Sequence, residues 1–272
     1  MNTDAKKVFT PLPFGQIKQE LQFALEQLPD DALKAWALRS AKSLGSISLR
    51  RGKTAAQAVL KLSIGLVKVA SESALATVQG KLGEYMEEKK NALQQSTAEL
   101  KQQSLDLWKD SKPLRRKLVT QPSEVAPEVL GMGLGFLAGS GGLDADGGIP
   151  DLDFMAGIGA HRSIFTHSLL AGAVVETLVM ASLDLVELVY QDLPEEHHAI
   201  WDAAHKHTQR FGQTFIRATD LGLAYHIGID GSFDGMTPYK DLPIALPMEG
   251  HRAILLGNSA ALAHEAIKKK KN

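Results

Sequence analysis

The chain has 272 residues, which suits one large domain or two of ordinary size with a core that needs no covalent support. Its 30 basic and 31 acidic residues give a formal net charge of −1, which excludes a globally basic nucleic-acid-binding protein, so we expect no nucleic-acid partner. A hydrophobic content of 44% and a charged content of 22% are typical of a globular chain. Cysteine is absent, which excludes disulfide frameworks, thiolate zinc sites and cysteine nucleophiles. Any metal must therefore be held by His, Asp or Glu.

We expect neither a targeting segment nor a membrane-spanning segment in the chain. Its start, MNTDAKKVFTPLPFG, has no apolar stretch of the kind found in secretory signals. The most apolar stretch, residues 168–190, is interrupted by Glu176, Asp184 and Glu187, so we interpret it as a buried helix with these acids on its exposed side. We expect a cytoplasmic protein.

Two basic segments raise the question of attachment to a surface. Residues 50–68 carry five Lys or Arg and no acid among apolar positions, and Lys268–Lys271 form a basic tail. Both features are typical of peripheral binding to an anionic membrane, which would be the inner face for a cytoplasmic protein. A packed helix with a solvated face, followed by a frayed tail, explains the same residues, and we favour that interpretation.

The first 120 residues have helical periodicity. We expect helices around residues 17–28 and 33–44, the second ending near Gly45, and a long helical pattern from Lys53 toward Lys109 with breaks. Within it an apolar heptad stripe is formed by Met86, Leu93, Leu100 and Leu107, while the other heptad seam is polar. Only one of the two heptad positions of a coiled coil is therefore apolar. This pattern predicts either that residues 82–107 pack on a partner helix or that they belong to an antiparallel helix pair within the chain.

The second half is also helical, and its composition changes after a basic, proline-containing connection at residues 112–127. We place the boundary there, with a helical N-terminal region at 1–120 that docks to a partner, a membrane or a regulator, and a second helical domain at 121–272. We expect helices at 168–190, from Asp192 toward Ala224, and at 262–271. Strand patterns are sparse, so the fold class predicted is all-α, a multi-helix bundle.

A glycine-rich stretch, residues 131–148, lies at the start of the second domain. It lacks the Gly-Lys-Ser/Thr ending and the preceding strand of a P-loop, so we interpret it as a helix through Leu137 followed by a loop. Four aspartates follow one another in this region: Asp144, Asp146, Asp151 and Asp153. Their spacing does not fit an EF-hand, because Gly148 and Met155 occupy ligand positions.

Histidines follow these aspartates in a pattern that indicates a metal site. His161 and His167 come shortly after Asp153, and His226 lies four residues before Asp230. Residues four apart on a helix share a face, so the last pair could grip one ion. Carboxylate and imidazole ligands suit zinc, manganese or iron.

These motifs resemble the YdjM-like, membrane-bound metal-dependent hydrolases. That family has a Pro-Asp-x-Asp element, a His-Arg-…-Thr-His-Ser-Leu-Leu element, and a His-x-x-x-Asp element followed by Thr-Pro and a proline-rich stretch. The matching positions here span about residues 145–247 in the same order: Pro150 to Asp153, His161-Arg162 with Thr166 to Leu170, His226 with Asp230, and Thr237-Pro238 with Leu242 to Pro247. Asp234 fits the spacing to Thr-Pro better than Asp230 does, so either could be the carboxylate of the third element.

The resemblance implies a metal-dependent hydrolase. One or two divalent ions, zinc or manganese, would lower the pKa of a bound water and supply hydroxide for attack on a phosphoester, with a phospholipid as the favoured substrate. The ligands implied are Asp151, Asp153, His161, His167, His226 and Asp230 or Asp234.

Three further residues are candidates for catalytic roles. Arg162 could hold a phosphate or form a salt bridge; Thr166, with Ser168, could orient the ligands or cap the following helix. Asp146, or its neighbour Asp144, is a candidate general base because of its proximity in sequence. A second metal site in the histidine-rich stretch competes with a solvated helix face, which we favour, at His197, His198, His205 and His207.

Two alternatives to a hydrolase remain open. The long N-terminal helices and the heptad stripe fit a helical interaction protein whose metal is structural or absent. They also fit a membrane-acting effector in which the N-terminal helices deliver the second domain.

Overall fold

The structure is a computed structural model that describes residues 13–29, 31–91, 95, 102, 112–156, 162–233 and 248–267. Over these residues the chain forms helices and connecting turns without strands, so the predicted all-α bundle is confirmed. The elements are α1 (Phe14–Gln27), α2 (Ala32–Val78), α4 (Lys112–Thr120), α5 (Pro122–Ser140), the 3-10 helix η2 (Pro150–Ala156), α6 (Leu169–Gln191), α7 (Ile200–Phe233) and α8 (Met248–Ile267).

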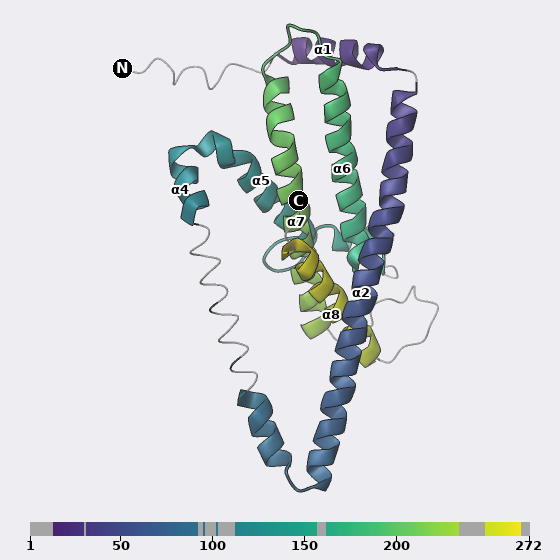
Figure 1. Ribbon diagram of the computed structural model, residues 1–272, viewed down its shortest axis with the longest axis vertical. Helices are drawn as coiled ribbons and strands as arrows, with labels where there is room; N and C mark the ends of the chain where they lie inside the picture. Colours follow the sequence, from purple (N-terminus) through teal and green to yellow (C-terminus); the bar gives the residue numbers. More distant parts are fainter. Residues whose placement is uncertain are drawn as a thin grey trace.

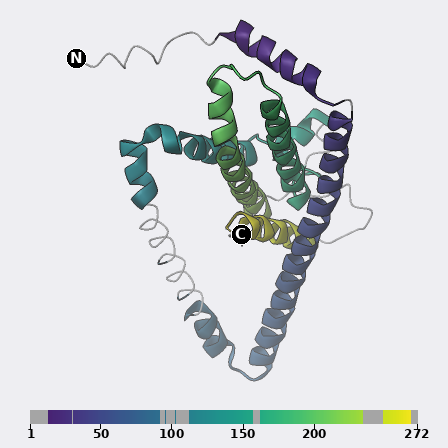
Figure 2. The same cartoon turned by 45° about the horizontal axis from the view of Figure 1, so that its top comes forward.

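Helices α6 and α7 form the centre of the bundle, and the other helices are arranged around them. The first half of α2 lies alongside α6, α1 crosses one end of the pair, and α8 packs across α7 and α2 near the other end (Figures 1 and 2). The largest fully buried apolar side chains lie where α6, α7 and α8 meet and include Leu169, Leu223, Ile227, Leu255 and Leu262. The predicted division at residue 120 stays a prediction, although α2 precedes it and packs on helices that follow it.

Helix α5 approaches α7 closely, which explains the glycine-rich stretch. A Cβ atom on Gly131, Gly135 or Gly139 would collide with backbone oxygens of α7, and Gly222 on α7 is equally close to α5. Glycines four residues apart thus form one face on which the two helices pack backbone to backbone. The sequence interpretation ended this helix at Leu137, whereas it continues to Ser140 and is closed by Gly141 at φ 74°.

Helix α2 is longer than the sequence suggested. It passes through Gly45, where we expected an end, and runs without a break to Val78. A glycine inside a helix costs about 1 kcal/mol relative to alanine, a local penalty that packing of α2 against α6 and α8 outweighs. Beyond this packed half, α2 projects from the bundle, and a turn at Gly80 leads into the helical residues 82–91.

Several other element boundaries can now be compared with the predictions. Helix α6 agrees with its prediction to within one residue at each end, and its N-cap is Ser168, whose hydroxyl accepts a hydrogen bond from the Leu170 amide. Helix α7 begins at Ile200 rather than Asp192 and extends past Ala224. Helix α8 begins at Met248, well before Leu262. Leu93, Leu100, Leu107 and the tail Lys268–Lys271 lie outside the described residues.

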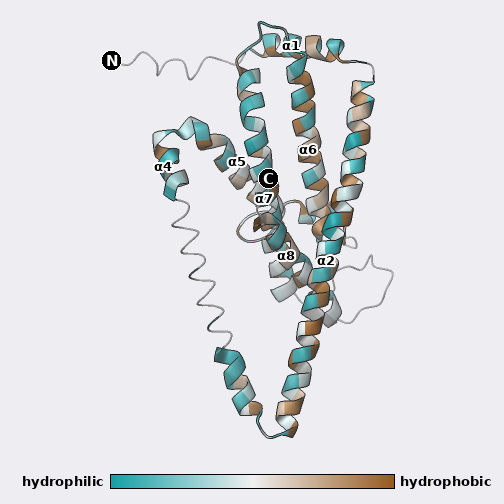
Figure 3. Cartoon of the chain, viewed as in Figure 1, coloured by the Kyte–Doolittle hydropathy of each residue, from teal (hydrophilic) through white to brown (hydrophobic). Residues whose placement is uncertain are grey.

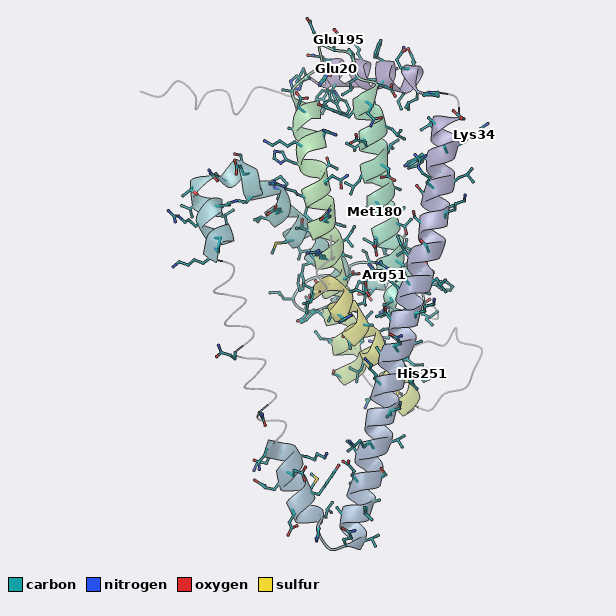
Figure 4. All side chains as sticks on the ribbon, in the orientation of Figure 1. Glu20, Lys34, Arg51, Met180, Glu195 and His251 are labelled. Atoms are coloured by element: carbon teal, nitrogen blue, oxygen red, sulfur yellow. The ribbon has the colours of Figure 1, made fainter. Side chains whose placement is uncertain are left out.

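A buried ion network joins α2 to the centre of the bundle, and it corrects our placement of Glu176. That side chain was expected to be exposed; instead the residue is 7% exposed and accepts hydrogen bonds from Arg51, which is 1% exposed. Arg51 also donates to both oxygens of Asp220 on α7, at 2.8 and 2.9 Å. Figure 4 shows Arg51 where α2 passes α6. Part of the basic segment therefore faces the protein.

Helix α6 is the one helix in the described part of the chain that is long and apolar enough to cross a membrane. In its most apolar 18-residue window, 44% of the residues are buried inside the bundle. Its hydrophobic character is visible in Figure 3 beside the more polar α7. Peripheral membrane attachment and a cytoplasmic location stay predictions.

Candidate metal centre

Three ligand-type side chains from distant parts of the sequence meet at the N-terminal end of α6. Asp151 comes from η2, His167 from the residue before the N-cap of α6, and His226 from the buried side of α7. One ligand atom of each lies within 4.8 Å of the others, so the group could hold a metal ion. The histidines are fully enclosed, with exposed fractions of 0% for His167 and 2% for His226.

Asp230, one helical turn after His226, brings a second carboxylate to this group. Its Oδ2 atom lies 3.3 Å from Nε2 of His167 and 3.7 Å from Nε2 of His226. Oδ1 of Asp151 lies 3.8 Å from Nε2 of His226. These separations exceed the 2.7–2.9 Å that is typical of charge-assisted hydrogen bonds. Ligands about 2.0–2.1 Å from a tetrahedral zinc ion are about 3.3 Å apart, so the observed spacing fits atoms that share an ion.

The far side of the His226 ring fixes which nitrogen faces the group. Its Nδ1 atom lies 3.2 Å from the backbone oxygen of Ser140, at the C-terminal end of α5. A carbonyl oxygen only accepts hydrogen bonds, so Nδ1 carries the proton. In the neutral ring Nε2 then presents its lone pair to Asp151 and Asp230, as a metal ligand requires.

His167 is held from behind in a similar way, by Asp153 and Thr166. Its Nδ1 atom lies 3.4 Å from Oδ2 of Asp153 and 3.0 Å from the Thr166 hydroxyl. The same Oδ2 atom accepts hydrogen bonds from that hydroxyl at 2.7 Å and from the Ser163 amide at 3.0 Å. A carboxylate in this position orients a ligating histidine and increases its basicity. The structure thus places this oxygen of Asp153 behind His167, rather than beside Asp151 and Asp230.

Arg162 contacts the centre through Asp230. Its Nη2 atom lies 3.2 Å from Oδ1 of Asp230, which leaves Oδ2 turned toward the two histidines. Of the two roles considered for Arg162, the geometry matches the salt bridge. Its backbone has φ 65°, a region that non-glycine residues rarely adopt, so a strained loop conformation aims this side chain inward.

The surroundings of Asp230 favour its ionised form in spite of its burial. Burial raises the pKa of this carboxyl group, but the contact with His167 and the positive charge of Arg162 lower it further, so that the net pKa lies below its usual value. Its Oδ2 atom is buried and makes no hydrogen bond with the residues that the structure describes. A buried anionic oxygen without a donor is unfavourable, and a cation beside it would remove that cost.

A tight glycine loop positions Asp151. The Gly147 amide donates to Oδ2 of Asp151, which leaves Oδ1 directed at His226. Gly147 and Gly148 have φ of 95° and 76°, and a Cβ atom on Gly148 would lie 2.6 Å from the Gly141 nitrogen. The loop that carries Asp144 and Asp146 leaves both side chains exposed, and neither belongs to the group of ligand atoms.

The structure leaves some predicted residues without an outcome. His161 and Asp234 lie outside the described residues, as does the segment from Thr237 to Pro247. The structure therefore gives a position for Asp230, and the choice between Asp230 and Asp234 stays untested. Sequence reasoning missed the backbone groups of Ser140, Gly147 and Ser163. These groups could not be predicted from residue type, because almost every residue has a backbone carbonyl and amide. The only hint in the sequence was that they lie in glycine-rich or serine-containing segments.

The histidine-rich stretch at the start of α7 forms separate pairs near the surface. His197 lies between the Pro194 oxygen at 2.8 Å and Asp202 at 3.1 Å, and His205 contacts Glu187 at 2.8 Å while stacking on Tyr190. Within the described part of the chain these side chains form no group of three ligands.

Comparison of the chain with models of protein families, with curated proteins and with solved structures found no match. What this chain does must therefore be argued from the geometry of its own residues.

Proposed function

We propose that the chain is a metal-dependent hydrolase of the YdjM-like type that acts on a phosphoester, with a phospholipid favoured, and that zinc or manganese binds between Asp151, His167, His226 and Asp230. One observation carries the proposal. Two buried histidines turn Nε2 toward two carboxylates, while their Nδ1 atoms are engaged by Ser140 and Asp153.

The charge of the centre supports a divalent ion. Two neutral imidazoles and two carboxylates carry a net charge of −2, which a divalent cation neutralises. Two nitrogen and two oxygen donors suit zinc or manganese better than calcium or magnesium, which prefer oxygen alone. His161 and Asp234 remain candidate ligands for a second ion.

Each residue of the centre has a role in this proposal. A bound ion supplies Lewis-acid activation of water or of a phosphoryl oxygen at neutral pH. Asp153 and Thr166 keep His167 in the ligating tautomer, and the Ser140 carbonyl does the same for His226. Arg162 holds Asp230 so that Oδ2 faces the two histidines, where it would be available to a bound ion. The role of Asp146 as general base stays a prediction.

The proposal is tested by loading metal-free protein with zinc or manganese and measuring hydrolysis of bis-p-nitrophenyl phosphate and of a short-chain phosphatidylcholine. We expect hydrolysis that a chelator abolishes and that His226→Ala removes. His264→Ala, an exposed histidine on α8, serves as the matched control and should keep activity. Absence of hydrolysis by a protein that binds stoichiometric metal would contradict the proposal.

A second candidate function is supported by the projecting half of α2. Its apolar residues recur at helical spacing and are exposed: Ile64, Val67, Leu75 and Val78. Such a face is typical of a helical interaction protein, in which the metal would be structural. Removing the metal with a chelator discriminates the two functions. If the intact protein has no hydrolytic activity and chelation reduces its helical circular dichroism, the metal is structural and the interaction function is favoured. If chelation removes hydrolytic activity while helicity is retained, catalysis is favoured.

A further inference from the structure

An apolar pocket lies between α2, the N-terminal end of α6, and α8. Its volume is about 530 Å³, within the range of about 300–1,000 Å³ that is usual for small-ligand sites. If each methylene group takes about 30 Å³, the volume of one water molecule in the liquid, the pocket has room for on the order of 15 methylene groups. Small residues of α2 keep it open, namely Gly52, Ala55 and Ala56.

The lining of this pocket favours a hydrocarbon over a polar ligand. Its polar side chains are Ser168 and Asn258, and both bind the backbone of the pocket's own walls. Ser168 donates to the Ile164 carbonyl and accepts from the Leu170 amide. Asn258 accepts from the Leu169 amide at 3.1 Å and donates to the Ile254 carbonyl at 2.9 Å. The other lining residues are Gly, Ala, Val, Leu or Ile.

The pocket adjoins the candidate metal centre through a shared loop. Ser168 and Leu169 line the pocket and directly follow His167, whose imidazole belongs to the metal group. Ile164, in the wall of the pocket, lies two residues from both Arg162 and Thr166. The segment from Ile164 to Leu169 therefore contributes residues both to the pocket and to the candidate metal centre.

We propose that the pocket holds the alkyl chain of the substrate, so that the substrate is an amphiphile with a phosphoester head, and that α2 supplies the wall that selects it. This inference rests on the proposed function for the identity of the head group. It gives α2, which lies outside the region that resembles the hydrolases, a direct part in binding. Larger side chains at Gly52 or Ala56 would fill the space that the chain needs.

The binding half of the proposal is tested on metal-free protein with a fluorescent chain, 11-(dansylamino)undecanoic acid. We expect saturable binding that Gly52→Leu weakens by about tenfold or more. Gly45→Leu is the matched control, because both glycines lie on α2 with no atom within 4 Å of an added Cβ, while Gly45 does not line the pocket. The control should bind within twofold of the original chain. Equal binding by Gly52→Leu, or no saturable binding, would overturn the pocket assignment.

The substrate half is tested on metal-loaded protein with p-nitrophenyl phosphodiesters carrying methyl, butyl, octyl or dodecyl groups. We expect kcat/KM to rise by up to about fourfold per methylene, the factor for its full burial, and Gly52→Leu to flatten this dependence. A flat dependence in the original chain overturns the assignment and leaves the hydrolase intact. If no ester is hydrolysed while the dansyl probe binds as expected, the proposed function fails and the pocket remains.

Discussion

Two clusters of buried charge contact α6 and α7, and they are built in opposite ways. In the first, Arg51 and Glu176 with Asp220 form hydrogen bonds of 2.7–2.9 Å, so that each carboxylate has a guanidinium donor. In the second, the carboxylates of Asp151 and Asp230 face imidazole nitrogens at 3.3–3.8 Å. In the first cluster one guanidinium donates to both carboxylates, whereas in the second Arg162 binds Oδ1 of Asp230 while Oδ2, together with Oδ1 of Asp151, faces the histidine nitrogens.

This difference separates a structural role from a functional one. A buried ion network that satisfies itself fixes the position of α2 against the bundle, and it needs nothing from solution. In the second cluster the Nδ1 atoms of both histidines have protein partners, while their Nε2 atoms face carboxylate oxygens at separations that suit a shared ion. The first three of the following predictions each concern one cluster and should leave the other intact, and the fourth concerns a surface pair outside both.

The largest effect is expected from Arg51→Ala. It would leave Glu176 and Asp220 buried without this cation, and breaking one side of a buried ion pair typically costs about 3–5 kcal/mol. Urea denaturation measures the loss in free energy of unfolding. Arg50→Ala is the control, because Arg50 also binds Glu176 but its side chain is 44% exposed, so that about 1 kcal/mol or less should be lost. Equal losses for the two variants would argue against the network.

Zinc should stabilise the folded protein through the second cluster. At a free concentration 1,000 times the dissociation constant, a ligand that binds only the folded state adds about 4 kcal/mol to the free energy of unfolding. His226→Ala should abolish this gain, while Arg50→Ala should keep it. The measurement is the thermal midpoint with and without zinc. An unchanged midpoint in the original chain, or a full gain in His226→Ala, would speak against the centre.

Thr166→Val tests the contacts behind His167. The hydroxyl of Thr166 binds both Asp153 and Nδ1 of His167, so its removal should weaken zinc binding by about 10–100-fold. Thr166→Ser retains the hydroxyl and should bind zinc within a fewfold of the original affinity. Competition with a chromophoric chelator gives both constants. If valine and serine bind zinc equally well, the hydroxyl does not support the ligand.

The smallest effect concerns His197, a surface histidine whose protonation depends on its two partners rather than on zinc. The Pro194 carbonyl and then the Asp202 carboxylate raise the pKa of His197 above its usual value. A raised folded-state pKa means that this pair contributes stability below the unfolded pKa and loses it as pH rises through the folded pKa. NMR titration should show Asp202→Asn lowering the pKa of His197. An unchanged pKa would remove Asp202 as a cause.

The sequence predicted the helical fold well where local signals dominate. Helix α6 could be bounded to within one residue, because a long, mostly apolar stretch follows a capping serine. The end expected at Gly45 was wrong, since the tertiary contacts of α2 outweigh the local cost of glycine. Glu176 was placed on the wrong side of its helix because its partner Arg51 lies 125 positions away in the sequence.

The candidate site shows the same limit. The His226 and Asp230 pair follows from helical periodicity alone, and the structure brings both side chains to one point. The place of Asp153 does not follow from spacing, because a motif cannot tell which nitrogen of a histidine its carboxylate will face. The carbonyl of Ser140 sets the tautomer of His226. This contact could not be predicted from the sequence, because every residue type has a backbone carbonyl.

Anomalous diffraction at the zinc edge from crystals of zinc-loaded protein tests the central claim most directly. We predict a peak within about 2.0–2.2 Å of Nε2 of His167, Nε2 of His226 and an oxygen of Asp151. A peak only at the surface pairs around His197 and His205, or no ordered zinc at a concentration that saturates binding in solution, would contradict the claim.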